Sequence, residues 1–297
     1  MSCAIHAVDL VYRYPNGHPA LDGIDLHVRH GERVAVLGPN GAGKTTLMLH
    51  LNGLMTGSGA LEVAGVEVGP KTLPELRRRV GLVFQDPDDQ LFMPTVEEDV
   101  AFGPLNMGLE PDAARERVAE ALGAVRMKAA AERAPHQLSM GERRRVAIAT
   151  VLAMHPSLLV LDEPSANLDP RARRELLEVL ARIERTMLVT THDLPLAAEL
   201  CERAVILARG RVVADGPCRQ ILGNGELLRA NDLELPAGFH LDRVALRPRG
   251  SADEKPRLPV GLTSRVYVEL GQRGSHVAEA HAHRHPGALV KLRREVK

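Results

Sequence analysis

The sequence predicts an α/β fold with a helical insertion, because short apolar strand patterns alternate with helical segments along much of the chain. Arg33 to Leu37 (RVAVL) runs into glycines and then into a predicted helix from Lys44 to Asn52. From Leu158 onward, the apolar stretches LLVLD, MLVTT and AVILARG are separated by the helical stretch RARRELLEVLARIER. Such alternation is typical of helices packed on a sheet, so the core is predicted to be α/β.

The first thirty residues have a different pattern, in which short apolar pieces alternate with polar residues. The stretches AIHAVDLVYRY and ALDGIDLHV are separated by the turn formers Pro15, Asn16 and Gly17. Turn residues between alternating stretches favour antiparallel strands. We therefore predict an antiparallel β subdomain ahead of the core.

Composition changes along the chain predict two further parts. A helical subdomain is expected over about residues 88–156, where Pro111 to about Ala134 has helical spacing and Asp112 is the predicted helix cap. After about Asn231, proline, glycine and charged residues replace this periodicity, which predicts a linker and a small extension. The predicted domains are residues 1–231 and a C-terminal extension over residues 232–297.

The overall composition narrows the classes of partner. Acidic and basic side chains balance at 38 each, and aromatic residues make up 2% of the 297 residues. Nucleic acid is therefore not expected as a partner, because long-range attraction and base-stacking platforms are both weak. The chain lacks a run of roughly 20 apolar residues that could cross a bilayer, so we expect it to be cytosolic.

The three cysteines and the two runs of arginine are predicted to have structural rather than functional roles. Cys3, Cys201 and Cys218 are too few and too scattered for a disulfide framework or a zinc site, which predicts reduced thiols. The runs Arg77–Arg79 and Arg143–Arg145 are predicted to be solvated helix faces rather than nucleic-acid contacts.

A glycine-rich loop between a predicted strand and helix has the pattern of a P-loop. Its glycines let backbone N–H groups approach phosphate oxygens, Lys44 would pair with the β and γ phosphates, and Thr45 would offer its hydroxyl to Mg²⁺. The same pattern also occurs as an ordinary turn before a helix, but its position after RVAVL favours phosphate binding. The predicted loop residues are Gly38, Pro39, Asn40, Gly41, Ala42, Gly43, Lys44, Thr45 and Thr46.

A second candidate segment is the apolar strand LLVLDE, which ends in two acids. Asp162 could hold Mg²⁺ through water, and Glu163 could polarise an attacking water. Strands that end in acidic residues are common, so it is the P-loop upstream that favours a catalytic interpretation of this segment. The two motifs together still allow kinases, GTPases and motor ATPases.

Residues Leu138 to Glu142 (LSMGE) discriminate among these classes. Here the chain resembles the ATP-binding-cassette family, whose signature Leu-Ser-Gly-Gly-Gln opens a helix about twenty residues before the acidic strand. The resemblance covers roughly residues 5–231. It implies an ATP-hydrolysing transporter subunit with a P-loop NTPase fold, comprising an antiparallel β subdomain, a RecA-like core and a helical subdomain. It also implies that Ser139 and Gly141 grip the γ-phosphate of ATP bound to a second subunit, in a head-to-tail dimer.

The signature departs from the family pattern at two positions. Met140 replaces the first glycine and Glu142 replaces the glutamine. A carboxylate near triphosphate costs electrostatic energy but still accepts a ribose hydroxyl, so Glu142 is kept as a nucleotide-binding residue. We expect weakened dimer closure rather than lost function.

Further residues match family elements one by one. Tyr14 matches the aromatic residue that stacks on adenine, and Gln85 matches the glutamine that touches Mg²⁺ and reports nucleotide state to the membrane partner. Ser165–Asp169 (SANLD) matches the loop that crosses the dimer interface. His192 matches the histidine that contacts the γ-phosphate and orients water. Without the resemblance, each residue has an ordinary structural interpretation.

The segment from Gln85, QDPDDQLFMPTVEEDVAFGPLNMGL, closely resembles the energy-coupling-factor importers, especially the cobalt and nickel branch. The resemblance implies that Phe92, Met93 and Pro94 receive a helix of an integral membrane subunit, at the cytoplasmic face of the cell membrane. The alternative is ordinary packing within the helical subdomain. ATP and Mg²⁺ are the expected cofactors.

The C-terminal tail and the cargo leave alternatives open. His276, His281, His283 and His285 could capture Co²⁺, Ni²⁺ or Zn²⁺, or could belong to a polar tail without metal. An importer of a vitamin, or a soluble ATPase acting in assembly or regulation, are the alternatives to a metal importer. Whether the two nucleotide-binding subunits are identical is also open.

Overall fold

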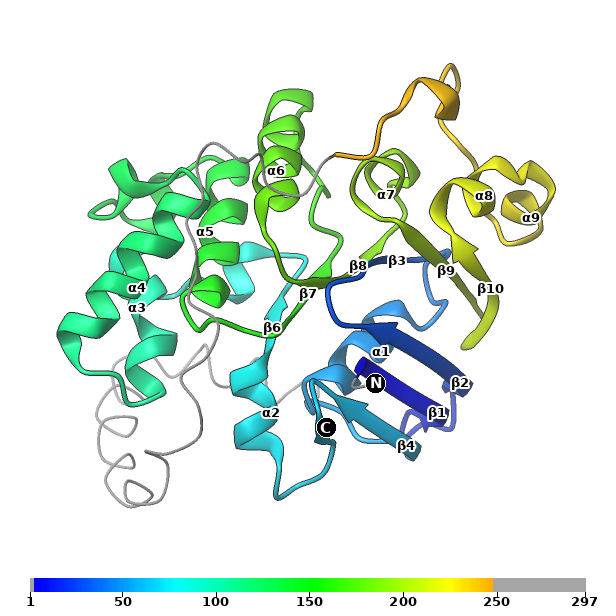
Figure 1. Ribbon diagram of the computed structural model, residues 1–297, viewed down its shortest axis with the longest axis horizontal. Coiled ribbons are helices and arrows are strands. Elements are labelled where there is room, and N and C mark those ends of the chain that lie inside the picture. The colour runs from blue at the N-terminus through cyan, green and yellow to red at the C-terminus, as the bar shows by residue number, and fades with distance from the viewer. Residues whose placement is uncertain (1–2, 248–297) are drawn as a thin grey trace. The chain divides into compact units, whose positions relative to one another are not determined.

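The computed structural model describes residues 3–247, which lie within one compact unit. Two sheets form its centre, one with strand order β2-β1-β4-β5 and one with order β10-β9-β3-β8-β7-β6 (Figure 1). The predicted α/β class with an antiparallel β subdomain and a helical region is confirmed. The strands are β1 (Cys3–Arg13), β2 (Pro19–Arg29), β3 (Arg33–Leu37), β4 (Ser58–Val63), β5 (Val66–Glu67), β6 (Val80–Val83), β7 (Leu158–Asp162), β8 (Thr186–Thr191), β9 (Arg203–Ala208) and β10 (Arg211–Pro217).

The antiparallel sheet forms from the alternating N-terminal stretches, as predicted. Strand β1 pairs antiparallel with both β2 and β4. The turn between β1 and β2 is closed by a hydrogen bond of 2.8 Å from the Gly17 N–H to the Tyr14 carbonyl. Gly17 has a φ of 84°, which glycine adopts without steric cost.

The six-stranded sheet is parallel in β3, β6, β7, β8 and β9, and β10 is its antiparallel edge strand. Its central strands are apolar and buried on both faces, which is the pattern of a covered parallel sheet. Alternate residues enter different cores: Val34 and Val36 join the core shared with β1 and β2, whereas Ala35 and Leu37 join the core formed by the helices. The sheet is therefore the middle layer, and its carboxyl ends share one edge.

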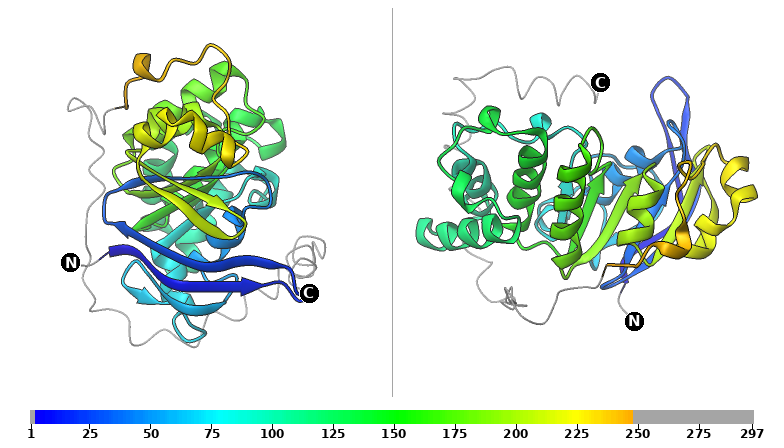
Figure 2. Two further views of the ribbon diagram at one scale, coloured as in Figure 1. Left: turned by 90° about the vertical axis from the view of Figure 1, so that its right-hand side faces the viewer. Right: turned by 90° about the horizontal axis from the view of Figure 1, so that it is seen from above.

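Helices α3, α4 and α5 lie at one end of this sheet and α8 and α9 at the other (Figures 1 and 2). The three helices α3 to α5 fall within the predicted helical subdomain. The α-helices are α1 (Lys44–Leu51), α2 (Leu73–Arg79), α3 (Val96–Asn106), α4 (Pro111–Ala124), α5 (Met140–Leu152), α6 (Pro170–Arg182), α7 (Leu194–Leu200), α8 (Cys218–Gly223) and α9 (Gly225–Ala230).

Helix α4 differs from its prediction at both ends. Glu110, not Asp112, is the residue at the N-cap, because Pro111 occupies the first helical position that its fixed φ favours. The Asp112 carboxylate instead pairs with Arg115. The helix ends at Ala124 rather than near Ala134, because the chain turns through a left-handed Arg126 with a φ of 60°.

The first part of the predicted extension packs against the core rather than forming an open linker. Leu233 is buried, and Arg219 donates to the carbonyl oxygens of Leu241, at 2.8 Å, and Val244. The Arg247 N–H donates to the Glu199 carbonyl at 2.8 Å. The domain boundary at residue 231 stays a prediction, and the four tail histidines lie outside the described residues.

The state of the cysteines and the length of the helices can be compared with what the composition predicts. The three cysteines are free, and Cys201 and Cys218 are buried, in agreement with the predicted thiols. Among residues 3–247, the helices are all too short or too polar to cross a bilayer.

Candidate functional site

The loop between β3 and α1 has a backbone that requires glycine. Gly43 has a φ of 104°, and a Cβ placed there would lie 2.5 Å from the Ala20 carbonyl oxygen. A Cβ at Gly38 would lie 2.3 Å from the Leu207 carbonyl oxygen. Both distances are far inside van der Waals contact. The loop residues Gly38 to Thr46 therefore follow a tight path that leads directly into the N-terminus of α1, as an anion-binding loop does.

Lys44 holds its ammonium group inside this loop. Its Nζ donates to the carbonyl oxygens of Gly38 at 2.7 Å and Pro39 at 3.1 Å, and lies 4.0 Å from Glu163 Oε1. Burial lowers the pKa of Lys44, and the carboxylates of Glu163 and Asp162 oppose this shift. A buried cation thus faces two carboxylates at the edge of the sheet.

Thr45 and Asp162, the two residues predicted to serve Mg²⁺, are in direct contact. The Thr45 hydroxyl donates to Asp162 Oδ2 at 3.2 Å, and the Thr190 hydroxyl donates to Asp162 Oδ1 at 2.5 Å. Burial raises the pKa of Asp162, and the hydrogen bonds from both hydroxyl groups oppose this shift. Hydroxyl and carboxylate oxygens are the hard donors that Mg²⁺ prefers.

Glu163 and His192 are brought into direct contact from the ends of β7 and β8. Glu163 Oε2 lies 2.9 Å from His192 Nδ1, and it accepts hydrogen bonds from the Thr191 hydroxyl at 3.1 Å and the His192 N–H at 3.2 Å. The Glu163 side chain is 8% exposed, whereas that of His192 is 64% exposed. Glu163 is therefore fixed in the sheet edge while the histidine reaches into solvent.

Tyr14 lies beside the glycine-rich loop. Its hydroxyl shares a hydrogen bond of 2.9 Å with the Thr46 hydroxyl, and its ring packs edge-on against Tyr12 with centroids 5.3 Å apart. Tyr12 packs in the same manner on the buried His50 of α1, at 4.9 Å. These contacts orient the half-buried Tyr14 ring next to the loop. The bond to Thr46 was not predicted, because it joins residues that are far apart in the sequence.

Gln85 is placed in the loop after β6, and its side chain is exposed. Strand β6 ends at Val83, two residues before Gln85. The loop leaves the sheet because the Phe84 N–H bonds to Gln90 Oε1 at 3.2 Å instead of continuing the ladder. Gln90 in turn donates to the Ala147 carbonyl of α5 at 2.7 Å.

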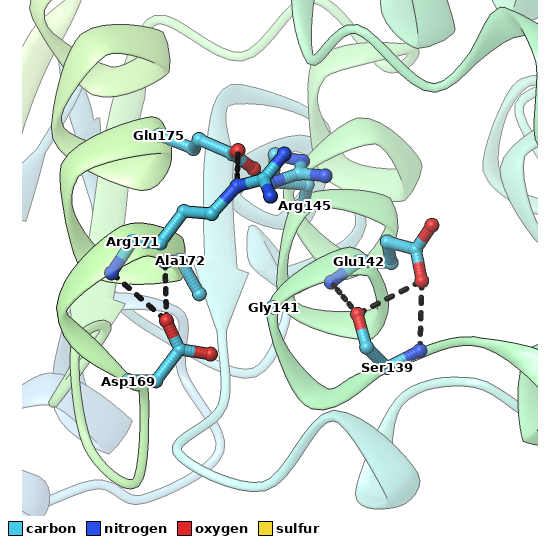
Figure 3. Close-up of a pocket in the computed structure, with 8 residues that line it drawn as sticks. All are labelled: Ser139, Gly141, Glu142, Arg145, Asp169, Arg171, Ala172 and Glu175. Carbon is cyan, nitrogen blue, oxygen red and sulfur yellow. Dashed lines mark hydrogen bonds and ion pairs between the residues drawn. The ribbon is translucent and has the colours of Figure 1, made fainter.

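Ser139, Gly141 and Glu142 form a second, separate site at the start of α5. They line a pocket of about 290 Å³ whose lining residues come from the starts of α5 and α6 (Figure 3). The glycine-rich loop contributes none of the pocket residues described. The remaining lining residues are Arg145, Asp169, Arg171, Ala172 and Glu175.

Glu142 caps its own helix. Its Oε2 accepts hydrogen bonds of 2.8 Å from both the N–H and the hydroxyl of Ser139, while the Glu142 N–H bonds back to the Ser139 hydroxyl at 3.4 Å (Figure 3). These bonds from Ser139, aided by the nearby Arg133, lower the pKa of Glu142. The spacing Ser-x-x-Glu is the sequence signature of this capping box, and the sequence prediction did not use it.

The arginine runs differ from each other. In the first run, Arg77 and Arg78 are exposed, as predicted. In the second run the prediction of a solvated face is wrong, because Arg144 is 1% and Arg145 9% exposed. Polar partners explain the burial: Arg145 pairs with Glu175 at 2.7 Å, and Arg144 binds backbone carbonyls.

Similarity to known proteins identifies the family. The ABC transporter family profile matches residues 21–166. An ABC transporter ATP-binding protein of Streptomyces coelicolor is 58% identical over 231 residues, which cover 77% of this chain and 89% of the relative. The chain therefore belongs to the ABC transporter family and is an ATP-binding ABC transporter ATPase.

Three further similarities are to one relative and two solved structures. The energy-coupling factor transporter ATP-binding protein EcfA of Methanothermobacter thermautotrophicus is 46% identical, over 79% of this chain and 81% of the relative. The structure of cbiO1 from Clostridium perfringens, part of the ABC transporter complex cbiONQ, has a TM-score of 0.70 at 36% identity, covering 80% of this chain and 97% of that one. A dimeric ATP-binding cassette bound to ADP and Pi has a TM-score of 0.64 at 27% identity, covering 72% and 98%.

The glycine requirement of the loop is testable by unfolding. We expect Gly43→Ala to lower the free energy of unfolding by more than about 2 kcal/mol, because a left-handed φ and a backbone clash act together. Gly41→Ala is the matched control, since its φ is 78° but a Cβ there meets nothing within 4 Å. It should cost about 1 kcal/mol. Equal losses for the two variants in urea denaturation without nucleotide would contradict the steric argument.

Proposed function

We propose that this ATPase binds MgATP at the carboxyl edge of the six-stranded sheet and hydrolyses it with Glu163 to drive a membrane importer. The observation that carries the proposal is the convergence of Lys44, Glu163 and His192 from three elements. Lys44 Nζ and His192 Nδ1 lie 4.0 Å and 2.9 Å from the two oxygens of the same carboxylate. A cation, a carboxylate and an imidazole at one sheet edge suit phosphoryl transfer to water.

The nucleotide would be held by groups that are already oriented. The N–H groups of the glycine-rich loop and the N-terminus of α1 suit the phosphates, and Lys44 suits the β and γ phosphates. Tyr14, fixed by Thr46, suits stacking on adenine. Thr45 and Asp162 would hold Mg²⁺, with Gln85 as a further oxygen ligand, because Mg²⁺ takes few protein ligands and keeps phosphate oxygens and waters.

Hydrolysis would depend on positioning and on charge neutralisation. Glu163, held by the Thr191 hydroxyl and the His192 N–H, would orient the attacking water. The exposed His192 imidazole would contact the γ-phosphate, and Lys44 would neutralise charge on it. These groups act in a site whose carboxylates are buried, where electrostatic interactions are strong.

A second nucleotide-binding subunit completes the site in this proposal. Ser139 and Gly141 lie at a helix N-terminus whose pocket is built apart from the glycine-rich loop, which suits the γ-phosphate of ATP bound to a partner in a head-to-tail dimer. The Ser139 hydroxyl already donates to Glu142 at 2.8 Å, so binding phosphate would exchange that hydrogen bond. This exchange supports the expectation of weakened closure.

An apolar patch on α3 and the preceding loop suits an integral membrane subunit. Phe92, Phe102 and Leu105 are 55%, 43% and 47% exposed, and the two rings pack edge-on at 4.9 Å. Exposed apolar groups gathered in this way mark interaction surfaces. The chain would sit at the cytoplasmic face of the membrane with this patch, together with Met93 and Pro94, receiving a helix of its partner.

Cobalt or nickel is the proposed cargo, by resemblance to the cobalt and nickel importers in the segment after Gln85. The membrane subunit recognises the cargo, so the cargo must be identified by measuring uptake into cells. Cells that lack this chain should lose uptake of radioactive Co²⁺ or Ni²⁺ and regain it with the intact gene. Unchanged metal uptake, with loss of vitamin uptake, would contradict this cargo.

Glu163→Gln tests the proposed chemistry. We expect ATP turnover to fall about 100-fold or more, because the amide no longer polarises water, while ATP affinity stays within about threefold. Glu178→Gln is the control, since Glu178 forms a surface pair with Arg126 at 2.8 Å. Turnover follows from phosphate release and affinity from equilibrium binding. Undiminished hydrolysis by Glu163→Gln would overturn the catalytic assignment.

Asp99 fixes the backbone of the patch and should make stability depend on pH. Asp99 Oδ1 accepts hydrogen bonds of 3.0 Å from the N–H groups of Phe92 and Met93. Burial raises the pKa of Asp99 from 3.8 to about 6. Because the folded protein binds this proton more tightly, the resulting stability is present below pH 3.8 and is lost as pH rises through about 6.

Asp99→Asn should remove this dependence. The difference in unfolding free energy between wild type and variant is expected to change by on the order of 3 kcal/mol between pH 7 and pH 4, in favour of the wild type at pH 4. Chemical denaturation at several pH values measures it. A difference that does not vary with pH would show that Asp99 titrates normally.

A further inference from the structure

Arg144 is a buried cation that the proposed chemistry does not use. It lies in the second turn of α5, it is 1% exposed, and its guanidinium binds backbone carbonyl groups. One terminal nitrogen donates to Phe84 at 3.1 Å and to Gln85, and the other donates to Ala166 at 3.2 Å. Three elements that are distant in sequence therefore meet at one side chain.

Both loops that Arg144 binds carry residues of the proposed nucleotide site. The carbonyls of Phe84 and Gln85 belong to the loop after β6. The Ala166 carbonyl belongs to the loop after β7, where the Ala166 N–H bonds to the Glu163 carbonyl at 3.1 Å. Arg144 thus supports the turn that begins at Glu163 as well as the backbone of Gln85.

The loop after β6 is fastened to α5 at a second point. Phe84 donates its N–H to Gln90, and Gln90 donates to Ala147 and Thr150 of α5, both at 2.7 Å. Phe84 is thus held through its N–H by Gln90 and through its carbonyl by Arg144. The helix that starts with Ser139 and Gly141 is in this way connected to the Gln85 loop.

We propose that Arg144 is a positioning residue that couples the start of α5 to the Gln85 loop and to the Glu163 turn, so that these three parts of the ATPase site move as one unit. The proposal rests on the proposed roles of Ser139, Gln85 and Glu163. It adds that one guanidinium of α5 joins the Gln85 loop to the Glu163 turn.

The chemistry of arginine suits this role. A planar guanidinium donates several hydrogen bonds in fixed directions and stays charged, whereas an ammonium group is a compact point charge. Burial lowers the pKa of Arg144, and the carboxylates of Asp86 and Asp162 oppose this shift. Removing the side chain would leave three carbonyl groups without this donor and would loosen two loops at once.

Arg144→Met tests the coupling in the full-length protein. Turnover of ATP is expected to fall about tenfold or more, since small displacements of catalytic groups have effects of this size, while the equilibrium dissociation constant for ATP stays within about threefold. Amide hydrogen exchange should quicken in residues 84–90 and 164–168 and stay unchanged in β3. A merely structural role would instead lower ATP binding and turnover together.

Two further variants complete the experiment. Arg115→Met is the control, because Arg115 of α4 pairs with Asp112 on an exposed helix face and belongs to neither loop; its turnover should stay within about twofold. Arg144→Lys keeps the positive charge but loses the planar guanidinium with its several fixed donors. Its turnover should lie between those of wild type and Arg144→Met. If Arg144→Met fails to fold, the turnover of Arg144→Lys alone tests the coupling.

The outcomes are distinguishable. Full turnover by Arg144→Lys and Arg144→Met overturns the coupling, and so does a loss of turnover that follows a loss of ATP binding, or faster exchange confined to α5. Glu163→Gln is measured beside them. If it alone is inactive, the coupling fails while the proposed catalytic role stands; if it hydrolyses ATP normally, the catalytic role itself fails.

Discussion

The alignment of parallel strands at one edge of the six-stranded sheet is the constraint on which the rest of the structure depends. Parallel pairing of β3, β7 and β8 delivers Lys44, Glu163 and His192 to the same edge, although they are far apart in sequence. The register pairs Asp162 with Thr190, whose hydroxyl holds the Asp162 carboxylate. Ligands commonly bind where strand ends of such sheets meet, because loops from several strands converge there.

The electrostatics of this edge follow from the same packing. Burial between two apolar cores disfavours the charged forms of both Lys44 and Asp162, and their mutual proximity opposes that cost. The Glu163 carboxylate opposes the cost for Lys44 but adds to it for Asp162. Threonine hydroxyl groups donate hydrogen bonds to both carboxylates. The side chains of the site are therefore oriented before any nucleotide binds. In the proposed function, the separate pocket at Ser139 binds the γ-phosphate of ATP that a second subunit holds.

Much of this fold and site could be predicted from sequence because the signals are local. The apolar runs of β3, β7 and β8 and the glycines before Lys44 are read directly from neighbouring residues. The burial of Arg144 could not be read, because its partners are carbonyls of loops about sixty and twenty residues away and a run of three arginines resembles a solvated face. Asp112 was misassigned because Pro111 occupies the first helical position, which places the N-cap two residues earlier, at Glu110.

In the proposed function, the edge formed by β3, β7 and β8 holds ATP and Mg²⁺ against Lys44, Thr45 and Asp162. A crystal structure of Glu163→Gln grown with ATP and Mg²⁺ measures this directly. The account predicts β and γ phosphate oxygens within about 3.2 Å of Lys44 Nζ, and a metal ion bound by the Thr45 hydroxyl. A nucleotide bound elsewhere, or a metal ion without contact to Thr45 or Asp162 directly or through water, would contradict it.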